Sequence, residues 1–270
     1  MILRRRVFLD GAALDEADPR ILIQAIEPAA GKDSLSAAAL GDGYGSRMTE
    51  EHRDSLDIAV RFSINEKSYR PEERADALEK ALAWAAKGGW LTVNYKPGRR
   101  IRVIPAQLPG EGDAADRGTQ YTITFRAYGN PWWQETEPDP ETATGSSADL
   151  TLLAWGSRET EIEFTFRNTS GSTVDALTVT VTDPDGKVSS MSFTGLGLGS
   201  GETLRADHED NGRRRIQRIR IRNAAGTEWR SAMAARTGHD ELRTAPGNAR
   251  VQMTAGGAGE FAVWAYGRFA

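Results

Sequence analysis

The feature that most constrains the fold of this chain is a strand–helix–strand block in residues 53–103. Its first strand has an apolar residue at every second position: Leu56, Ile58, Val60, Phe62 and Ile64. Polar residues such as Asp57 and Arg61 occupy the positions between them. This period of two is typical of a strand with one face in the core and the other in solvent.

A helix follows this strand. Pro71 suits the first helical turn, where an amide donor needs no partner, and Glu72 and Glu73 favourably oppose the helix dipole. The pair Gly88-Gly89 ends the helix. The apolar stripe predicted to face a sheet is Ala75, Leu78, Leu82 and Ala85. Two extended runs, 90–93 and 100–103, follow, so the block predicts an α+β module.

Several parts of the chain together resemble the distal tail (Dit) proteins of siphoviruses, the bacteriophages with long non-contractile tails. The run Arg53-Asp54-Ser55-Leu56-Asp57-Ile58, followed by Arg74 and Trp84, is similar to a strand and helix of that family. The strand 121–125 and the run Pro131-Trp132-Trp133 resemble the end of its first domain. Pro246-Gly247-Asn248 resembles the turn before its last two strands.

The resemblance implies a structural virion protein at the tail tip, or baseplate, rather than an enzyme, with no cofactor. It implies a homohexameric ring around the DNA channel that joins the tail tube protein to the tail-associated hub protein. Receptor-binding protein and tape measure protein are further partners that it suggests. Synthesis and assembly are expected in the host bacterial cytoplasm, and the mature location is the virion tail tip.

The sequence predicts two domains. Residues 134–147 are rich in Pro, Gly and acidic side chains and are expected to be a linker between a ring-forming domain, 1–133, and a second domain, 148–270. Short extended runs without a helix pattern favour an antiparallel β-sandwich there: 150–155, 160–167, 173–182, 187–193, 202–207, 215–222, 249–254 and 260–267. The family resemblance suggests a galectin-like or carbohydrate-module-like sandwich. The fold class is therefore mainly β with one helix.

Two stretches of the first domain, 28–52 and 105–118, are expected to be long irregular loops. Loops of this length in a compact domain are usually functional or disordered. We expect the first to order on ring assembly. Its candidate contact residues are Asp42, Tyr44, Arg47 and Glu50. The glycine-rich run 195–201 is predicted to be a loop between strands because no helix follows it to bind a phosphate.

Composition excludes several function classes. The chain has 270 residues, no cysteine, and a formal net charge of −4, which gives no global attraction to nucleic acid. No apolar run approaches the roughly 20 residues of a membrane span, and the N-terminus lacks the pattern of a signal peptide. The three histidines lie outside any hydrolase or metal motif. Catalytic, cofactor and metal residues are therefore all predicted to be absent.

Two charged clusters have competing interpretations. The acidic run 207–211 is read as a solvated turn, with a Ca²⁺ loop as the weaker alternative. Arg218, Arg220 and Arg222 share one strand face, for which ion pairing across strands is favoured over contact with another tail protein or with DNA.

The tryptophans support an alternative function. In this second hypothesis the sandwich binds glycans and attaches the particle to the host surface. The candidate glycan or partner contacts are Trp132, Trp133, Trp155, Trp229 and Trp264. For Trp132 and Trp133, packing at the end of the first domain is favoured over sugar stacking.

Overall fold

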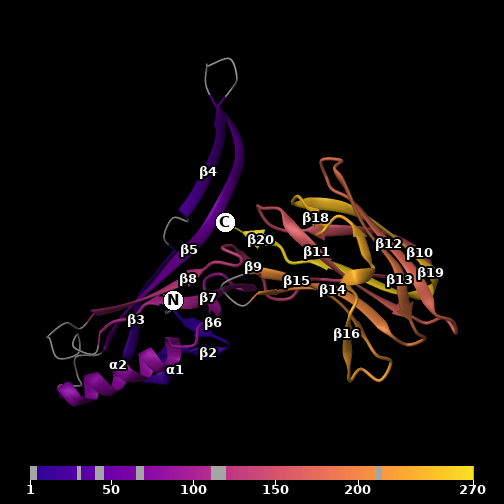
Figure 1. Ribbon diagram of the computed structural model, residues 1–270. Helices are drawn as coiled ribbons and strands as arrows, with labels where there is room; N and C mark the ends of the chain where they lie inside the picture. The colour runs from indigo at the N-terminus through magenta and orange to yellow at the C-terminus, as the bar shows by residue number, and fades with distance from the viewer. Residues whose placement is uncertain are drawn as a thin grey trace. The chain divides into compact units, whose positions relative to one another are not determined.

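The structure is a computed structural model that describes residues 5–28, 32–39, 46–64, 70–110, 120–210 and 215–269. For residues 28, 32–39 and 46–54 the description covers the backbone alone. The chain divides into two compact units: unit 1 contains Met1–Trp133, and unit 2 contains Gln134–Glu209 and Ile216–Ala270. Each unit is described by itself below (Figure 1).

Unit 1 is an antiparallel sheet with helices. Its strands are β1 (Val7–Leu9), β2 (Ala12–Ala13), β3 (Ile21–Pro28), β4 (Lys32–Ala39), β5 (Ser46–Ile64), β6 (Gly89–Val93), β7 (Arg99–Gln107) and β8 (Gln120–Ala127). The strands run in the order β2-β1-β6-β7-β8-β5-β3, and β4 pairs with β5. Strand β9 (Trp133–Glu135) crosses the boundary between the units. The pattern that predicted a half-buried strand is confirmed, because Ile58, Val60 and Phe62 of β5 are fully buried.

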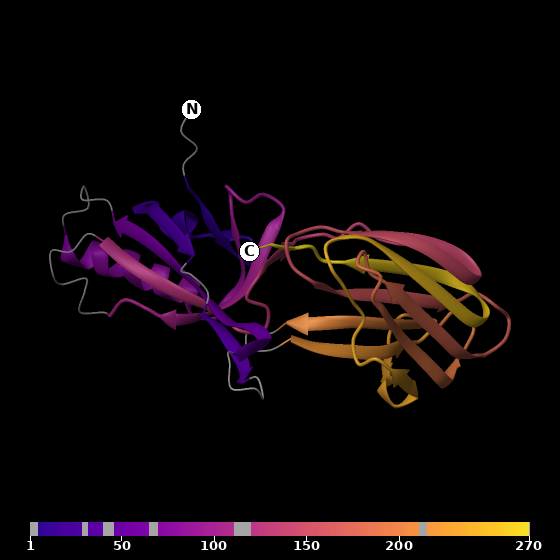
Figure 2. The ribbon, with the colours of Figure 1, turned by 90° about the horizontal axis from the view of Figure 1, so that it is seen from above.

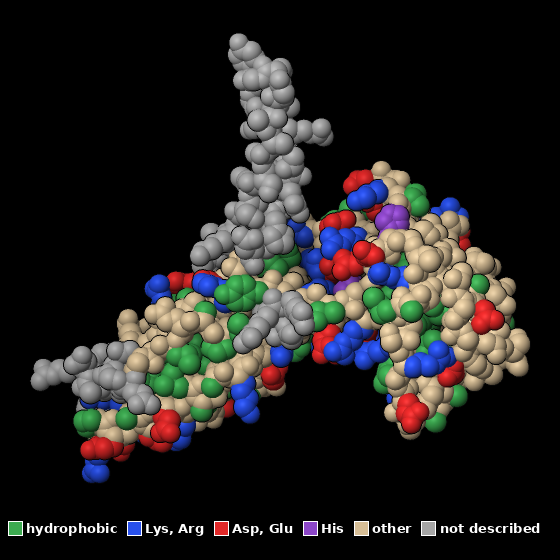
Figure 3. Space-filling view, viewed as in Figure 1, with side chains coloured by type: hydrophobic (Ala, Val, Ile, Leu, Met, Phe, Trp, Pro, Cys, Tyr) green, Lys and Arg blue, Asp and Glu red, His purple; other side chains and the backbone are tan. Residues whose placement is uncertain are grey.

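Helix α2 (Pro71–Ala85) begins at the predicted proline, and the short helix α1 (Leu14–Ala17) precedes β3. The buried stripe of α2 differs from the prediction: Ala75 is exposed and Ala77 is buried, so the helix is rotated toward Ala77. Trp84 fixes the helix to the sheet, since its Nε1 donates to the Ala12 carbonyl at 2.8 Å and its ring meets Phe125 edge-on at 5.9 Å. Acidic and basic side chains mix along the outer side of α2 (Figure 3).

The segment predicted to be an irregular loop, 28–52, contains paired strands instead. Strand β4 pairs with the first part of β5, from Lys32 opposite Ser55 to Ala39 opposite Ser46. Strand β3 pairs with the rest of β5 on the same edge. Figure 1 shows β4 and the first part of β5 extending away from the other strands of unit 1. Regular backbone pairing, which composition does not reveal in a Gly-, Ala- and Ser-rich run, explains the difference.

Unit 2 contains β10 (Glu141–Ala154), β11 (Thr160–Asn168), β12 (Val174–Thr182), β13 (Val188–Leu198), β14 (Thr203–Asp210), β15 (Arg215–Arg222), β16 (Trp229–Ser231), β17 (Arg236–Gly238), β18 (Arg243–Thr244), β19 (Gly247–Ala265) and β20 (Arg268–Phe269). A 3-10 turn, η2 (Met233–Ala235), lies between β16 and β17. The ladders of β19 with β10, β11 and β12, and the ladder of β12 with β13, are antiparallel. The burial of alternate residues leaves one face of these long strands in the core. The predicted β-sandwich is therefore confirmed.

Two long strands connect the layers of the sandwich. The first half of β19 pairs with β12 and its second half pairs with β11, while β10 pairs with β19 along its whole length. Figure 2 shows the pink β10 and the yellow β19 side by side. Two predictions are corrected here: the last two predicted strands are one strand, and residues 141–147 of the expected linker are the start of β10.

The core of unit 2 is aromatic and close-packed. Phe166 and Phe261 lie with ring centroids 4.8 Å apart, and Phe164 meets Phe193 edge-on at 6.2 Å. Position 259 requires glycine, because a Cβ there would lie 2.1 Å from the Phe166 ring. The predicted glycine loop 195–201 is also corrected: β13 continues to Leu198, with Gly195 and Gly197 at positive φ.

Candidate functional site

The tryptophan pair near the end of unit 1 packs in two different ways. Trp133 is 1% exposed, and the Lys96 ammonium lies 4.7 Å from its ring centroid. Burial, together with the charge of Arg99, lowers the pKa of Lys96. Trp132 is half-buried. Trp133 is therefore a packing residue, and its ring is closed to a sugar.

The three tryptophans of unit 2 are not gathered into one site. Trp155 is 58% exposed after β10, whereas Trp264 on β19 is buried and donates through Nε1 to Glu163 at 3.1 Å. Trp229 on β16 is 42% exposed, and the guanidinium of Arg220 lies 4.3 Å from its ring centroid. Cation–π stacking occupies one face of the Trp229 ring.

The arginine ladder of β15 forms the predicted ion pairs across strands. Arg220 Nη2 lies 3.0 Å from Asp207 Oδ2, and Arg218 pairs with Glu209. The acidic run 207–210 is therefore part of strand β14 rather than the predicted turn. Within the described part of the chain, no group of three or more acidic or histidine side chains is placed to hold a metal ion.

A buried polar chain holds several strands of unit 2 together. Glu163 on β11 accepts from Trp264 Nε1 and from the His208 backbone amide at 3.0 Å, with His208 Nδ1 at 3.3 Å. On the other side of the imidazole, Glu241 Oε1 lies 3.7 Å from His208 Nε2. The neighbouring His208 imidazole, and then the hydrogen bond from Arg243 Nη2 at 2.6 Å, lower the pKa of Glu241 to about 2. The side chains of Glu163 and His208 are 3% and 2% exposed, so the chain is structural.

The ring-assembly residues proposed from the sequence cannot be placed as side chains. Asp42 and Tyr44 lie outside the described residues. Arg47 and Glu50 lie on the backbone of β5, opposite Ala38 and Ser36 of β4. Their assignment as contact residues stays a prediction.

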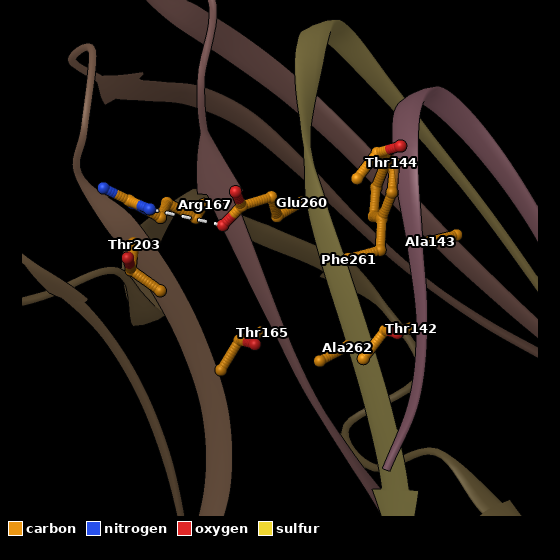
Figure 4. Close-up of a pocket in the computed structure, with 9 residues that line it drawn as sticks. All are labelled: Thr142, Ala143, Thr144, Thr165, Arg167, Thr203, Glu260, Phe261 and Ala262. Atoms are coloured by element: carbon orange, nitrogen blue, oxygen red, sulfur yellow. Dashed lines mark hydrogen bonds and ion pairs between the residues drawn. The ribbon is translucent and has the colours of Figure 1, made fainter.

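A concave site lies on the sandwich, on the outward face of neighbouring strands (Figure 4). Its volume is about 590 Å³. It is lined by Thr142, Ala143 and Thr144 of β10, Thr165 and Arg167 of β11, Thr203 of β14, and Glu260, Phe261 and Ala262 of β19. The register places Thr142 and Thr165 on either side of Ala262, and Thr144 and Arg167 on either side of Glu260. We call this site the threonine hollow.

The threonine hollow carries polar groups without net charge. Arg167 Nη1 lies 3.3 Å from Glu260 Oε2, and both side chains are about half exposed, at 54% and 51%. Four threonines, Thr142, Thr144, Thr165 and Thr203, also line the hollow. The Phe261 side chain is buried and points into the core, where it stacks on Phe166.

Sequence reasoning missed the threonine hollow for a clear reason. Its residues come from four strands, and their proximity depends on the register of β10, β11 and β19. The period-two pattern places Thr165 and Arg167 on the outward face of β11, but it does not say which residues lie opposite them.

The fold can be compared with solved structures. The Dit protein of phage SPP1, described as a paradigm of the hub adsorption apparatus in phages that infect Gram-positive bacteria, matches 98% of this chain and 99% of its own length. The TM-score is 0.66 at 13% sequence identity. The chain has a Dit-like fold. No protein-family model and no curated protein sequence matches the chain.

A second structure matches the chain more distantly. A chain of the phage P2 baseplate, in its activated conformation with Ca, matches 97% of this chain and 98% of its own length, with a TM-score of 0.50 and 8% identity. The resemblance noted in the sequence is confirmed as a Dit-like fold that includes both units. At such low identity the shared property is the fold, and the function is argued separately.

Proposed function

We propose that this chain is a structural protein of a bacteriophage tail tip, a distal tail protein that assembles into a homohexameric ring. The observation that carries the proposal is the match of both units, over nearly the whole chain, to the Dit protein of phage SPP1. A match of one unit alone would support only a common β-sandwich, which serves many functions. The role is architectural and needs neither catalysis nor a cofactor.

The proposal assigns ring formation to residues 1–133 and a peripheral position to the sandwich, 148–270. Unit 1 offers a feature suited to self-association. Within the described residues, β4 pairs with β5 and has no strand on its other edge. An unpaired strand edge is a template for pairing with another chain, and a two-stranded ribbon alone is only marginally stable in water. Pairing of β4 with a strand of a neighbouring copy would cover the open edge and would also stabilise the two-stranded ribbon.

A closed ring needs a heterologous interface, in which one surface of a copy meets a different surface of the next. The β4–β5 ribbon would supply one surface and the rest of unit 1 the other. In the virion the ring would join the tail tube protein to the tail-associated hub protein, with receptor-binding and tape measure proteins as further partners. Assembly would take place in the host bacterial cytoplasm. No helix among the described residues combines the length and apolar composition of a membrane span.

Electron microscopy of the purified full-length protein over a concentration series tests the proposal directly. We expect annular particles with sixfold symmetry and a central hole, and a mass near six times 29.4 kDa in light scattering. If the protein stays monomeric alone, the series is repeated with the tail tube protein of the same phage. A monomer under both conditions would refute the ring.

A deletion tests whether the β4–β5 ribbon, and not the rest of unit 1, forms the ring interface. Removing residues 28–52 and closing the gap with a short Gly-Ser turn keeps every β5–β8 pair, and it keeps every β3–β5 pair except Pro28 opposite Ile58. We expect a folded monomer where the full chain forms a ring. Trp229→Ala in unit 2 is the control and should assemble normally. An unchanged particle mass in the deletion would exclude the ribbon from the interface.

A further inference from the structure

We propose that the threonine hollow of unit 2 binds a neutral saccharide unit. The inference is independent of the tail role, because it rests on the chemistry of one surface of the sandwich rather than on the likeness to phage proteins. It also differs from sugar stacking on the tryptophans, none of which lines the hollow. Its volume of about 590 Å³ lies in the usual range of small-molecule sites.

The hydrogen-bonding groups of the hollow match those of a sugar. The hydroxyls of Thr142, Thr144, Thr165 and Thr203 can each donate and accept, as each hydroxyl of a saccharide does. The nearby Arg167 guanidinium adds donors, and the Glu260 carboxylate adds acceptors. The hydroxyls along one edge of a sugar ring can therefore bind both the donors and the acceptors of the hollow, whereas an ion of one sign can bind only one of the two.

The charge of the hollow selects a neutral ligand. Arg167 and Glu260 face each other across neighbouring strands and form an ion pair at 3.3 Å. An anion would gain Arg167 but would meet Glu260, and a cation would meet Arg167. Like charges brought this close cost binding energy, so the pair acts against charged ligands of both signs.

The floor of the hollow explains why a ring can enter. Ala262 lies between Thr142 and Thr165 in the register and carries only a methyl group. Its neighbours on the same face of β19, Glu260 and Trp264, are much larger. The lining residues of β11, β14 and β19 are held on strands paired on both sides, whereas those of β10 lie on a strand whose one described partner is β19. Most of the site is therefore formed before a ligand arrives.

Saturation-transfer NMR and titration calorimetry on the full-length protein test the proposal. The probes are N-acetylglucosamine, glucose, galactose, rhamnose and their neutral disaccharides, with galacturonate as the charged comparison. We expect at least one neutral probe to bind with a Kd on the order of 1 mM, since a ligand of about a dozen atoms gains little more. Galacturonate should bind at least several-fold more weakly than galactose.

Three variants locate the site. Ala262→Leu fills the floor and should abolish binding. Thr165→Val removes one hydroxyl at nearly constant shape and should weaken binding by about two- to tenfold. Thr178→Val is the matched control, because Thr178 is a partly buried threonine on β12, outside the hollow, whose hydroxyl pairs with Ser192.

Each outcome decides the inference. Loss of binding in Ala262→Leu with unchanged binding in Thr178→Val supports the hollow, provided that both variants keep the unfolding midpoint of the wild type. Absence of binding to every neutral probe overturns the inference, as does equal binding by Ala262→Leu and wild type. Neither negative result affects the ring, which is measured separately by particle mass.

Discussion

Gly88, at the end of α2, allows a sharp test of how the helix is joined to the sheet. Its φ is +62°, and a Cβ there would lie 2.4 Å from the Val103 carbonyl oxygen and 2.9 Å from Ile104 Cα. Gly98, in the turn before β7, has a similar φ of +71°, with nothing within 4 Å of a Cβ. Both glycines thus have a left-handed backbone conformation, but only at Gly88 would a side chain also clash with the backbone of β7.

The expected costs follow from that difference. A left-handed conformation costs a residue with a side chain about 1–2 kcal/mol, and the stiffer unfolded chain returns about 0.4–1 kcal/mol. Gly98→Ala should therefore lose about 1 kcal/mol of unfolding free energy. Gly88→Ala adds overpacking against backbone, about 1–3 kcal/mol, for a total of about 3 kcal/mol. The difference of about 2 kcal/mol corresponds to about 6–10 °C in the Tm of a unit of this size.

Urea unfolding followed by tryptophan fluorescence, with calorimetry to separate the two units, measures both variants. The unit 1 transition should move far more for Gly88→Ala than for Gly98→Ala, and the unit 2 transition should stay in place. If the two variants lose unfolding free energies that agree within about 0.5 kcal/mol, the argument is refuted, because a clash with β7 would then add nothing to the cost of Gly88→Ala.

Two further predictions concern carboxylates that lie beside cationic or imidazole groups. Asp18, which is buried, accepts from Arg20 Nε at 2.7 Å and Lys80 Nζ at 3.2 Å, and the pKa of Asp18 lies far below its usual range, chiefly because of Arg20. Asp18→Asn should lower the free energy of chemical unfolding by about 2 kcal/mol, which is less than for a fully buried ion pair because Lys80 is half exposed. Asp76 is exposed, so Asp76→Asn should lower it by less than about 1 kcal/mol. Equal costs for the two variants would contradict this reasoning. The lowered pKa of Glu241, about 2 against an ordinary 4.5, means that its stabilising effect is complete above pH 4.5 and is lost as the pH falls through 2. The stability difference between wild type and Glu241→Gln should therefore shrink between pH 5 and pH 2, and a difference independent of pH would exclude the contact with His208.

The sequence predicted local structure better than pairing. Pro71 and Gly88 marked the ends of α2 because their preferences depend on their own backbone. The period of two identified β5 for the same reason. The ribbon of β4 and the first part of β5 was missed, because the Ala- and Ser-rich sequence of β4 shows no such period.

The candidate site was less predictable than the fold. Tryptophans were chosen as contacts by residue type, yet Trp133 and Trp264 are buried, and the threonine hollow contains none of the five. Threonine is common on outward strand faces, so Thr142 and Thr165 carry no signal one at a time. Their grouping around Ala262 arises only from the register of three strands.

The pairing of β10 with β19 also decides how unit 2 would respond to mechanical load. The chain enters unit 2 at Gln134, just before β10, so tension from the preceding residues reaches the sandwich through the start of β10. The ladder of β10 with β19 runs from Glu141 opposite Val263 to Ala154 opposite Gly247, so the start of β10 lies beside the end of β19. A force that pulled these two strand ends apart would therefore break the hydrogen bonds one by one from that end, beginning at the pair Glu141–Val263.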